Sequence, residues 1–231
     1  TPSSAASDVY KRQIYIYAND YSEKNKQDLL KMVSSKEKVE ILLGNIHDGD
    51  IKDNGKLYLI QNIVKKINHD YIIVIDDDLN YPSDYVDKHI RCCLKYNNNV
   101  VSSIHGGLFS NIIYDLFDDR YLYHYRYNLK ENKFVTYTGT GTICIPCKFT
   151  KFINYEKTMY TGMVDIYFMN NMDLFDIKRV CLSREKWGWL KEFNDEIDET
   201  LYDVYKNNNK IQLNLINFNR NDKNKKKIVI I

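Results

Sequence analysis

The sequence predicts an α/β fold with a mainly parallel sheet and flanking helices. Short β-rich runs alternate with segments of helical spacing from Ile14 to His105, and this is the order that βαβ units produce. The length of 231 residues suits one sizeable domain, or one domain with a small appendage. Because 44% of the residues are apolar, the chain can bury a substantial core.

Local sequence features predict each strand and helix of the first half of the chain. The predicted strands are Ile14–Asp20, Lys38–Leu43, Tyr71–Ile75 and Asn97–His105. The predicted helices are Ser22–Val33, Lys56–Ile67 and Pro82–Tyr96. Ser22 suits the N-cap of the first helix, and Pro82 suits the first turn of the third. In the second helix, Leu57, Ile60 and Val64 recur at helical spacing.

The second half predicts a smaller β region. Tyr121–Leu129 alternates like a strand with its tyrosines on one face. The β-rich run Lys133–Ile145 is interrupted at Gly139 and Gly141, which predicts a kink or a close backbone approach. The remaining elements are a short helix and a last strand, Val164–Met172 and Arg179–Ser183. The Asn- and Lys-rich residues 201–231 predict a polar, partly loose tail.

Composition excludes several classes of protein. The 33 basic and 31 acidic residues give a net charge of +2, which is no global signal for nucleic acid or an anionic membrane. No apolar run approaches the ~20 residues of a membrane span, so we expect no transmembrane segment. Five cysteines, an odd number, do not predict a disulfide framework. For the lone CxxC of Cys144 and Cys147, reduced cysteines near a core are a simpler interpretation than zinc, and they suit a cytoplasmic protein.

The first residues need separate treatment. The stretch SSAASDVYKRQ (Ser3–Gln13) matches the translation of a sequencing-library adapter, and it lacks the apolar core of a signal peptide. Residues 1–13 are therefore excluded from the fold prediction, which assigns a single domain to residues 14–200. On this hypothesis the natural protein extends further upstream.

The clearest candidate for chemistry is the triplet Asp76, Asp77 and Asp78, which directly follows the apolar run Tyr71–Ile75. Ligands of open α/β sheets bind beyond the carboxyl ends of the strands, and strand alternation would send Asp76 and Asp78 to one side. Two such carboxylates are stable when Mg²⁺ or Mn²⁺ lies between them and an anionic ligand. The alternative is a solvated acidic turn that caps the next helix, a role that Asp84 would share.

Seven motifs between Ile14 and Leu190 carry a resemblance to a known family. In order, they are IYIYAND, GDIKDNGKLYL, VIDDDLNYPSDYV, IHGGLF, GTGTICI, MVDIYFM and KWGWLK. The chain resembles a bacterial family of sugar-nucleotide glycosyltransferases with the GT-A fold, related to the large family-2 group. The DDD and GTGT segments are the most specific of these motifs. The resemblance implies a Rossmann-like, mainly parallel sheet with flanking helices and a smaller β region on the acceptor side.

The resemblance also implies a donor site. Asp20 would contact the uracil or other base, and Asp53 and Lys56 would lie near the ribose and diphosphate. Asp76 and Asp78 match the aspartates of the DxD motif, for ribose and metal respectively, with both near the cation. A lysine at a helix start can offset phosphate charge, but from its spacing alone a solvated lysine at a helix end is the preferred interpretation of Lys56.

On the acceptor side, Asp165 matches the acidic residue that acts as catalytic base. Its alternative role is to stabilise the start of a short helix. His105 could approach the site, although a lone histidine is more often structural. Trp187 and Trp189 could form a platform for a sugar ring, or they could anchor the core.

The implied reaction is a direct displacement at the anomeric carbon of a nucleotide-sugar donor, with inversion. Asp165 would take the proton of the acceptor hydroxyl, and a metal ion on Asp78 would stabilise the departing nucleoside diphosphate. We expect a glycan or a lipid-linked acceptor, compatible with peripheral membrane association, and no nucleic acid. Two other classes remain open: a metal-dependent sugar-phosphate nucleotidyltransferase, and a non-catalytic module that binds nucleotides or glycans.

One expectation concerns the order of strands. In the resembled family a further strand, central in the sheet, precedes the segment that matches Ile14–Ala18. Adapter-like residues stand in its place here. We therefore expect either a vacancy or an unusual direct pairing between Ile14–Ala18 and Tyr71–Ile75.

Overall fold

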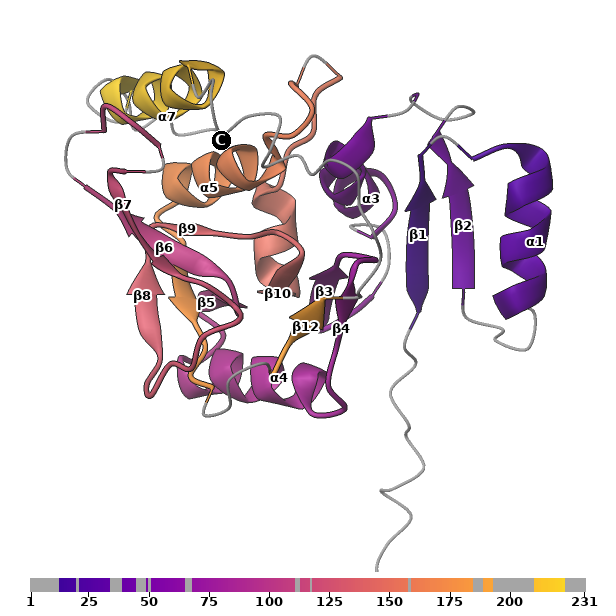
Figure 1. The fold of residues 1–231 in the computed structure, drawn as a ribbon, viewed down its shortest axis with the longest axis horizontal. Helices are drawn as coiled ribbons and strands as arrows, with labels where there is room; N and C mark the ends of the chain where they lie inside the picture. Colours follow the sequence, from indigo (N-terminus) through magenta and orange to yellow (C-terminus); the bar gives the residue numbers. More distant parts are fainter. Residues whose placement is uncertain are drawn as a thin grey trace, which may run out of the picture.

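The computed structural model describes most of the chain. The described residues are 13–19, 21–33, 39–44, 49, 51–64, 68–110, 113–116, 118–157, 159–184, 189–192 and 210–222. They form an α/β fold whose sheets contain both parallel and antiparallel strand pairs (Figure 1). The α/β prediction is confirmed at this level.

The first unit is a parallel pair of strands. β1 (Ile14–Ala18) and β2 (Val39–Leu43) are connected through α1 (Glu23–Val33). The Ser22 hydroxyl accepts a hydrogen bond from the Asn25 amide at 3.2 Å, so Ser22 caps α1 as predicted. Apolar side chains of α1 pack on the two strands.

The largest sheet has five strands in the order β3, β10, β5, β11, β8. Their bounds are β3 (Tyr71–Ile75), β10 (Thr142–Pro146), β5 (Val100–Ser103), β11 (Lys178–Cys181) and β8 (Lys133–Val135). Helix α4 (Tyr85–Lys95) connects β3 to β5, and α5 (Val164–Leu174) precedes β11. β3 has the bounds that the sequence predicts.

The prediction of a mainly parallel sheet is wrong. β5 and β11 are parallel, but β10 is antiparallel to both β3 and β5, and β8 is antiparallel to β11. Since β10 runs against both neighbours, β3 and β5 share one direction without pairing. All five residues of β10 are buried, so this strand from the second half of the chain lies inside the sheet and separates two strands of the first half.

A three-stranded antiparallel sheet forms the smaller β region. It contains β7 (Arg120–Tyr123), β6 (Gly106–Phe109) and β9 (Tyr137–Thr138). The remaining elements are η2 (Lys52–Asn54), α3 (Gly55–Asn62), β4 (Leu79–Asn80), η4 (Cys147–Phe152), β12 (Lys191–Glu192) and α7 (Lys210–Asp222). β4 and β12 pair antiparallel.

The tyrosine-rich strand is shorter than predicted. β7 ends at Tyr123, and the chain then turns, so the alternation does not continue to Leu129. The buried Arg184 explains the turn, because its guanidinium donates hydrogen bonds to the carbonyls of His124 and Tyr127. A buried cation that binds backbone carbonyls competes with strand pairing at the same groups.

β1 and β3 do not pair with each other. Within the described part of the chain, β1 pairs with β2 alone and β3 with β10 alone, and Figure 1 shows β1 and β2 as a separate pair. Helix α3 packs against both sheets: the ring centroids of Tyr17 and Tyr58 lie 5.3 Å apart, and Val74 joins a cluster with Leu57. The direct pairing that was one of the two expectations is therefore not observed, and the adapter-like residues 1–12, which bear on the expected vacancy, lie outside the described residues.

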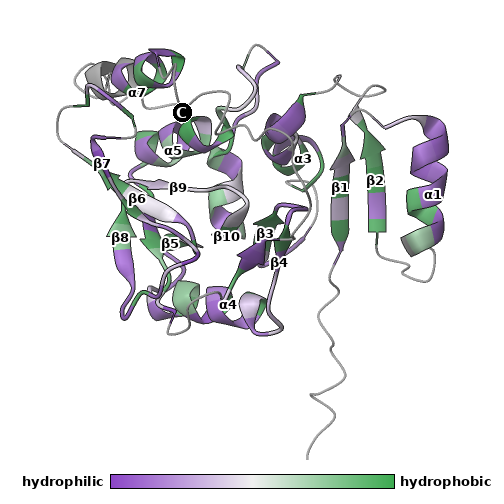
Figure 2. Ribbon diagram, viewed as in Figure 1, coloured by the Kyte–Doolittle hydropathy of each residue, from purple (hydrophilic) through white to green (hydrophobic). Residues whose placement is uncertain are grey.

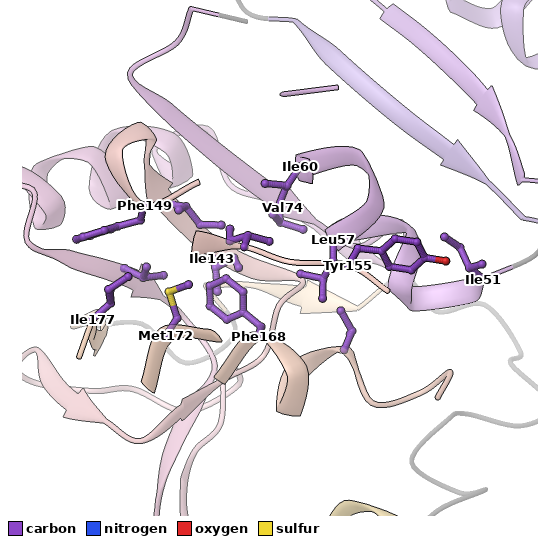
Figure 3. Packing of buried hydrophobic residues seen from close by; sticks show 14 residues of the cluster. Ile51, Leu57, Ile60, Val74, Ile143, Phe149, Tyr155, Phe168, Met172 and Ile177 are labelled. Atoms are coloured by element: carbon purple, nitrogen blue, oxygen red, sulfur yellow. The ribbon is translucent and has the colours of Figure 1, made fainter. Parts of the chain in front are cut away.

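The main core lies between the five-stranded sheet and the helices α3 and α5. Figure 3 shows its side chains converging from these elements, with Ile143 of β10 and Phe168 of α5 among them. Hydrophobic residues concentrate in the strands, while α1 and α4 carry many hydrophilic residues (Figure 2). Helices α1 and α4 thus cover the sheets with one face and meet solvent with the other.

A helix forms inside the stretch that the sequence predicts as a polar tail. α7 packs against α5 and buries Gln212 and Ile216. Apolar residues spaced along one face, such as Leu213 and Ile216, explain why a segment rich in Asn and Lys orders here. Among the described helices, none is both long enough and apolar enough to cross a membrane.

Helix α4 buries a histidine against β5. His89 is fully buried, and its Nδ1 lies 2.7 Å from the Ser102 hydroxyl. Its Nε2 is buried and has no hydrogen-bond partner in the described residues. Burial lowers the pKa of His89 from 6.5 to about 3.

The folded protein should therefore lose stability as the pH falls from 6.5 towards 3. The unfolded chain takes up a proton on His89 in this range and the folded chain does not, so protonation favours unfolding. His89→Phe removes this one titration and keeps an aromatic ring beside Tyr85. The drop in unfolding free energy between pH 6 and pH 5 should shrink by about 1 kcal/mol, measured by urea denaturation. An unchanged pH dependence in the variant would contradict the assignment.

Candidate functional site

The carboxyl end of β3 brings an acidic and a basic side chain together. Asp76 directly follows β3, and Lys56 lies in the first turn of α3. Lys56 Nζ forms an ion pair with Asp76 Oδ1. Burial alone would lower the pKa of Lys56, but the attraction of Asp76 and two further carboxylates outweighs it, so the net shift is upward and the ammonium stays charged. Those two carboxylates are Asp165 and Asp53.

Gly141 leaves the space that the Asp76 carboxylate fills. A Cβ atom at position 141 would lie 1.6 Å from Asp76 Oδ2 and 2.2 Å from its Cγ. No other residue type fits there without moving Asp76. Of the two predicted reasons for the interrupted β run, a close backbone approach is therefore the correct one at this position.

The hydroxyl of Tyr81 joins the same two residues. It accepts a hydrogen bond from the Asp76 amide at 2.8 Å and donates one to the Gly141 carbonyl at 2.9 Å. Burial raises the pKa of the Tyr81 phenol, so the hydroxyl keeps the proton that it donates.

Asp165, in the first turn of α5, contacts the neighbouring residue of the GTGT segment. Its Oδ1 accepts hydrogen bonds from the Thr140 amide at 2.8 Å and the Thr140 hydroxyl at 2.6 Å. Burial raises the pKa of Asp165, against the opposing attraction of Lys56 and the hydrogen bonds from Thr140. A carboxylate with a raised pKa is a stronger proton acceptor, which suits a general base.

Asp53 binds the start of α5. Its Oδ1 accepts a hydrogen bond from the Gly162 amide at 2.7 Å, and its Oδ2 accepts one from the Val164 amide at 3.2 Å. Amides at a helix start lack partners within the helix, so Asp53 acts as a cap supplied from another element. Its predicted contact with a donor ribose remains a prediction.

Asp77 and Asp78 lie in a turn after β3, so strand alternation does not continue through the triplet. Both are exposed. Partial burial and the repulsion of Asp76 and Asp77 raise the pKa of Asp78. Burial and the charge of Asp78 raise the pKa of Glu192 in β12, and Glu192 also forms an ion pair with Arg126. This rim of the site therefore carries excess negative charge.

His105 contacts the GTGT segment from the end of β5. Its carbonyl accepts a hydrogen bond from the Gly139 amide at 3.0 Å, and its amide donates to the Thr142 hydroxyl at 3.1 Å. Burial lowers the pKa of His105 to about 3, so the imidazole is neutral at pH 7. These contacts give His105 a structural role in holding the loop that contacts Asp76 and Asp165.

Of the two tryptophans predicted to form an aromatic platform, Trp189 is among the described residues. Trp189 Nε1 donates a hydrogen bond to Asp84 at 3.1 Å, and the ring stacks on Tyr85 with centroids 5.9 Å apart. One face of Trp189 thus serves as a packing anchor. Trp187 lies outside the described residues, as does Asp20, so the predictions for both remain open.

The arrangement offers three chemical functions. Lys56 can attract an anionic ligand, Asp165 can accept a proton, and Asp76 with Asp78 can share a cation. Among the residues that the structure describes, no group of three or more His, Cys, Asp or Glu side chains is arranged to hold a metal ion. A cation here would need oxygens from a ligand and water to complete its coordination, as is usual for Mg²⁺ bound with phosphates.

Sequence reasoning missed three participants. It gave no role to Tyr81 or Glu192, and it treated Thr140 only as part of a motif. The repeated Gly-Thr pattern was a signal for Thr140, because hydroxyls beside flexible backbone often bind nearby polar groups. Tyr81 and Glu192 carried no signal, since their contacts depend on tertiary structure.

No model of a known protein family matches this chain, and no curated protein matches it. The resemblance drawn from the motifs therefore remains a prediction.

Gly141→Ala should displace the Asp76 carboxylate and weaken its ion pair with Lys56, because the new methyl group would overlap the carboxylate. We expect a loss of ~1–3 kcal/mol of unfolding free energy by urea denaturation, the usual range for overpacking. Gly139→Ala is the matched control and should cost less, since its Cβ would meet the His105 ring at 3.2 Å.

A double-mutant cycle identifies the clashing group. In an Asp76→Ala background, Gly141→Ala should cost much less than in the parent chain, because the overlapping carboxylate is gone. Equal costs in the two backgrounds would show that the methyl group clashes with something other than Asp76.

Proposed function

We propose that this chain is a metal-dependent glycosyltransferase of the GT-A type. It would move a sugar from a nucleotide-sugar donor to a glycan or lipid-linked acceptor. One observation carries the proposal: Lys56, Asp76 and Asp165 lie within electrostatic reach of one another at the end of β3. Transfer from a diphosphate donor needs positive charge for the phosphates and a base for the acceptor, and Lys56 and Asp165 would supply them.

The motifs support the same conclusion from the sequence. The DDD and GTGT segments are the most specific parts of the resemblance, and more than sixty positions separate them in the chain. In the fold, Asp76 of the first segment packs directly on Gly141 of the second. A shared site explains why both segments are present.

The acidic turn after β3 fits a divalent cation. Partial burial raises the pKa of Asp78, and repulsion from Asp76 and Asp77 raises it further; a cation beside these carboxylates would relieve that repulsion. Asp78 and Asp76 would hold Mn²⁺ or Mg²⁺, together with donor phosphate oxygens and water. When bound, the metal would supply Lewis-acid stabilisation of the leaving diphosphate.

The chain's own residues would perform the other steps. Lys56 would attract the donor phosphates from the start of α3, and the ion pair with Asp76 fixes the direction of its side chain. Asp165 would take the proton of the acceptor hydroxyl as it attacks the anomeric carbon. Thr140 holds Oδ1 of this carboxylate, so Oδ2 is the oxygen that would take the proton. A single base and direct attack give inversion.

The partners follow from the same proposal. A lipid-linked acceptor would bring the enzyme to a membrane surface by peripheral association. The nearly balanced charge favours no nucleic acid partner. All five cysteines are free, as expected for a protein of the cytoplasm.

The deciding experiment incubates the chain with Mn²⁺ and a panel of UDP- and GDP-sugars and identifies the product. Metal-dependent release of nucleoside diphosphate is the expected result. Release of pyrophosphate in the presence of a sugar phosphate and a nucleoside triphosphate would instead identify a nucleotidyltransferase. Metal-dependent binding of a sugar nucleotide without release would identify a binding module.

Asp78→Asn should abolish the Mn²⁺-stimulated release of nucleoside diphosphate, because the amide cannot balance the charge of the cation. Asp77→Asn is the matched control: it makes the same charge change one residue away and should keep most of the activity. The measurement is turnover against Mn²⁺ concentration. Near-parent, metal-dependent activity in Asp78→Asn would disprove the metal assignment.

Asp165→Asn should lower turnover ~100-fold or more, in line with the loss of a general base. The amide oxygen can still accept both hydrogen bonds from Thr140, so the fold and donor binding should change little. Turnover and donor affinity are measured separately, the second by calorimetry with UDP and Mn²⁺. A matching loss of donor affinity would make Asp165 a binding residue or a structural cap.

A further inference from the structure

The antiparallel pairing of β3 with β10 stops one residue short of Asp76. Its last pair at this end joins Ile75 with Thr142, so the next pair in the same register would join Asp76 with Gly141. The Tyr81 hydroxyl bridges these two residues instead, at 2.8 Å from the Asp76 nitrogen and 2.9 Å from the Gly141 oxygen. A side chain thus extends the strand pairing by one step.

The ring that carries this hydroxyl is held in place. Tyr81 makes an edge contact with Tyr85, with centroids 4.7 Å apart, and Tyr85 in turn contacts His89 at 4.6 Å and stacks on Trp189. Tyr85 and His89 are buried. The hydroxyl position is therefore fixed by packing of the ring against α4 and Trp189.

We propose that Tyr81 is a positioning residue for Asp76. Its hydroxyl holds the Asp76 backbone against Gly141, so that the carboxylate fills the space above the glycine and faces Lys56. The role in donor binding rests on the glycosyltransferase function proposed above.

Without the hydroxyl, the Asp76 amide and the Gly141 carbonyl lose their shared partner. The backbone at the start of the acidic turn then loses its bridge to Gly141, because the strand pairing has already ended, and Asp76 is left with the ion pair of its side chain to Lys56. The Asp76 carboxylate would sample positions away from Lys56, and the site would bind the metal and donor phosphates less tightly. The chemical step, which depends on Asp165, would be preserved once the donor is bound.

The test compares Tyr81→Phe with Tyr85→Phe. Both variants remove one hydroxyl from the same aromatic stack, but the Tyr85 hydroxyl is buried and has no hydrogen-bond partner in the described residues. Release of nucleoside diphosphate is measured against Mn²⁺ and donor concentration, and binding of UDP with Mn²⁺ is measured by calorimetry. Hydrogen exchange of the Asp76 amide is followed by NMR.

Tyr81→Phe should raise the apparent Kd for Mn²⁺ with UDP and the donor KM roughly tenfold, about the effect of one hydrogen bond. Its kcat at saturation should stay within about twofold of the parent value, and the Asp76 amide should exchange faster. Tyr85→Phe should leave all four quantities unchanged.

The outcomes separate this proposal from the proposed function. Equal behaviour of the two variants in an active parent would overturn the role of Tyr81 alone. Loss of the folded state in Tyr81→Phe, or a fall in kcat without a change in KM, would also overturn it. A parent chain that neither binds UDP with Mn²⁺ nor releases product would overturn the proposed function, and the donor-binding role of Tyr81 with it. In that case, an unchanged rate of hydrogen exchange at the Asp76 amide in Tyr81→Phe would overturn the positioning role as well.

Discussion

The candidate site depends on one steric constraint, the absence of a side chain at position 141. The Asp76 carboxylate occupies the volume that a Cβ atom would need, with Oδ2 only 1.6 Å from the ideal Cβ position. This contact lets Asp76 lie within the fold and face Lys56 instead of pointing into solvent with Asp77. A carboxylate held in this way needs a cation nearby, because a partly buried charge is costly when it is unpaired.

Each of the four residues of the GTGT segment makes a different contact that stabilises the site. The Gly139 backbone binds His105, and Thr140 donates two hydrogen bonds to Asp165. Gly141 makes room for Asp76, and the Thr142 hydroxyl binds the end of β5. The glycines allow close approach and the threonines supply donors and acceptors, so the alternating pattern reflects two different physical requirements.

Charge at the site is unevenly distributed. Lys56 is attracted by three carboxylates, and this attraction keeps its ammonium charged despite burial. The Asp53 carboxylate already accepts hydrogen bonds from two amides at the start of α5. These bonds stabilise its negative charge, so it depends less on Lys56. On the outer side, burial and then the charge of Asp78 raise the pKa of Glu192, while burial and the charges of Asp76 and Asp77 raise the pKa of Asp78. Lys56 thus offsets part of the negative charge in the inner part of the site, and the rim retains negative charge that a divalent cation would offset.

The sequence by itself determined the local elements, because strand and helix propensities and capping depend on neighbouring residues. The apolar run Tyr71–Ile75 forms β3, Ser22 caps α1, and Asp76 stands at the end of a strand. Only the tertiary structure decided which strands become neighbours. β10 pairs antiparallel with both β3 and β5, and this placement brings Gly141 against Asp76 and Tyr81. Strand pairings of this kind join residues that lie far apart in the chain and depend on how the whole core packs. A local sequence pattern therefore does not predict them.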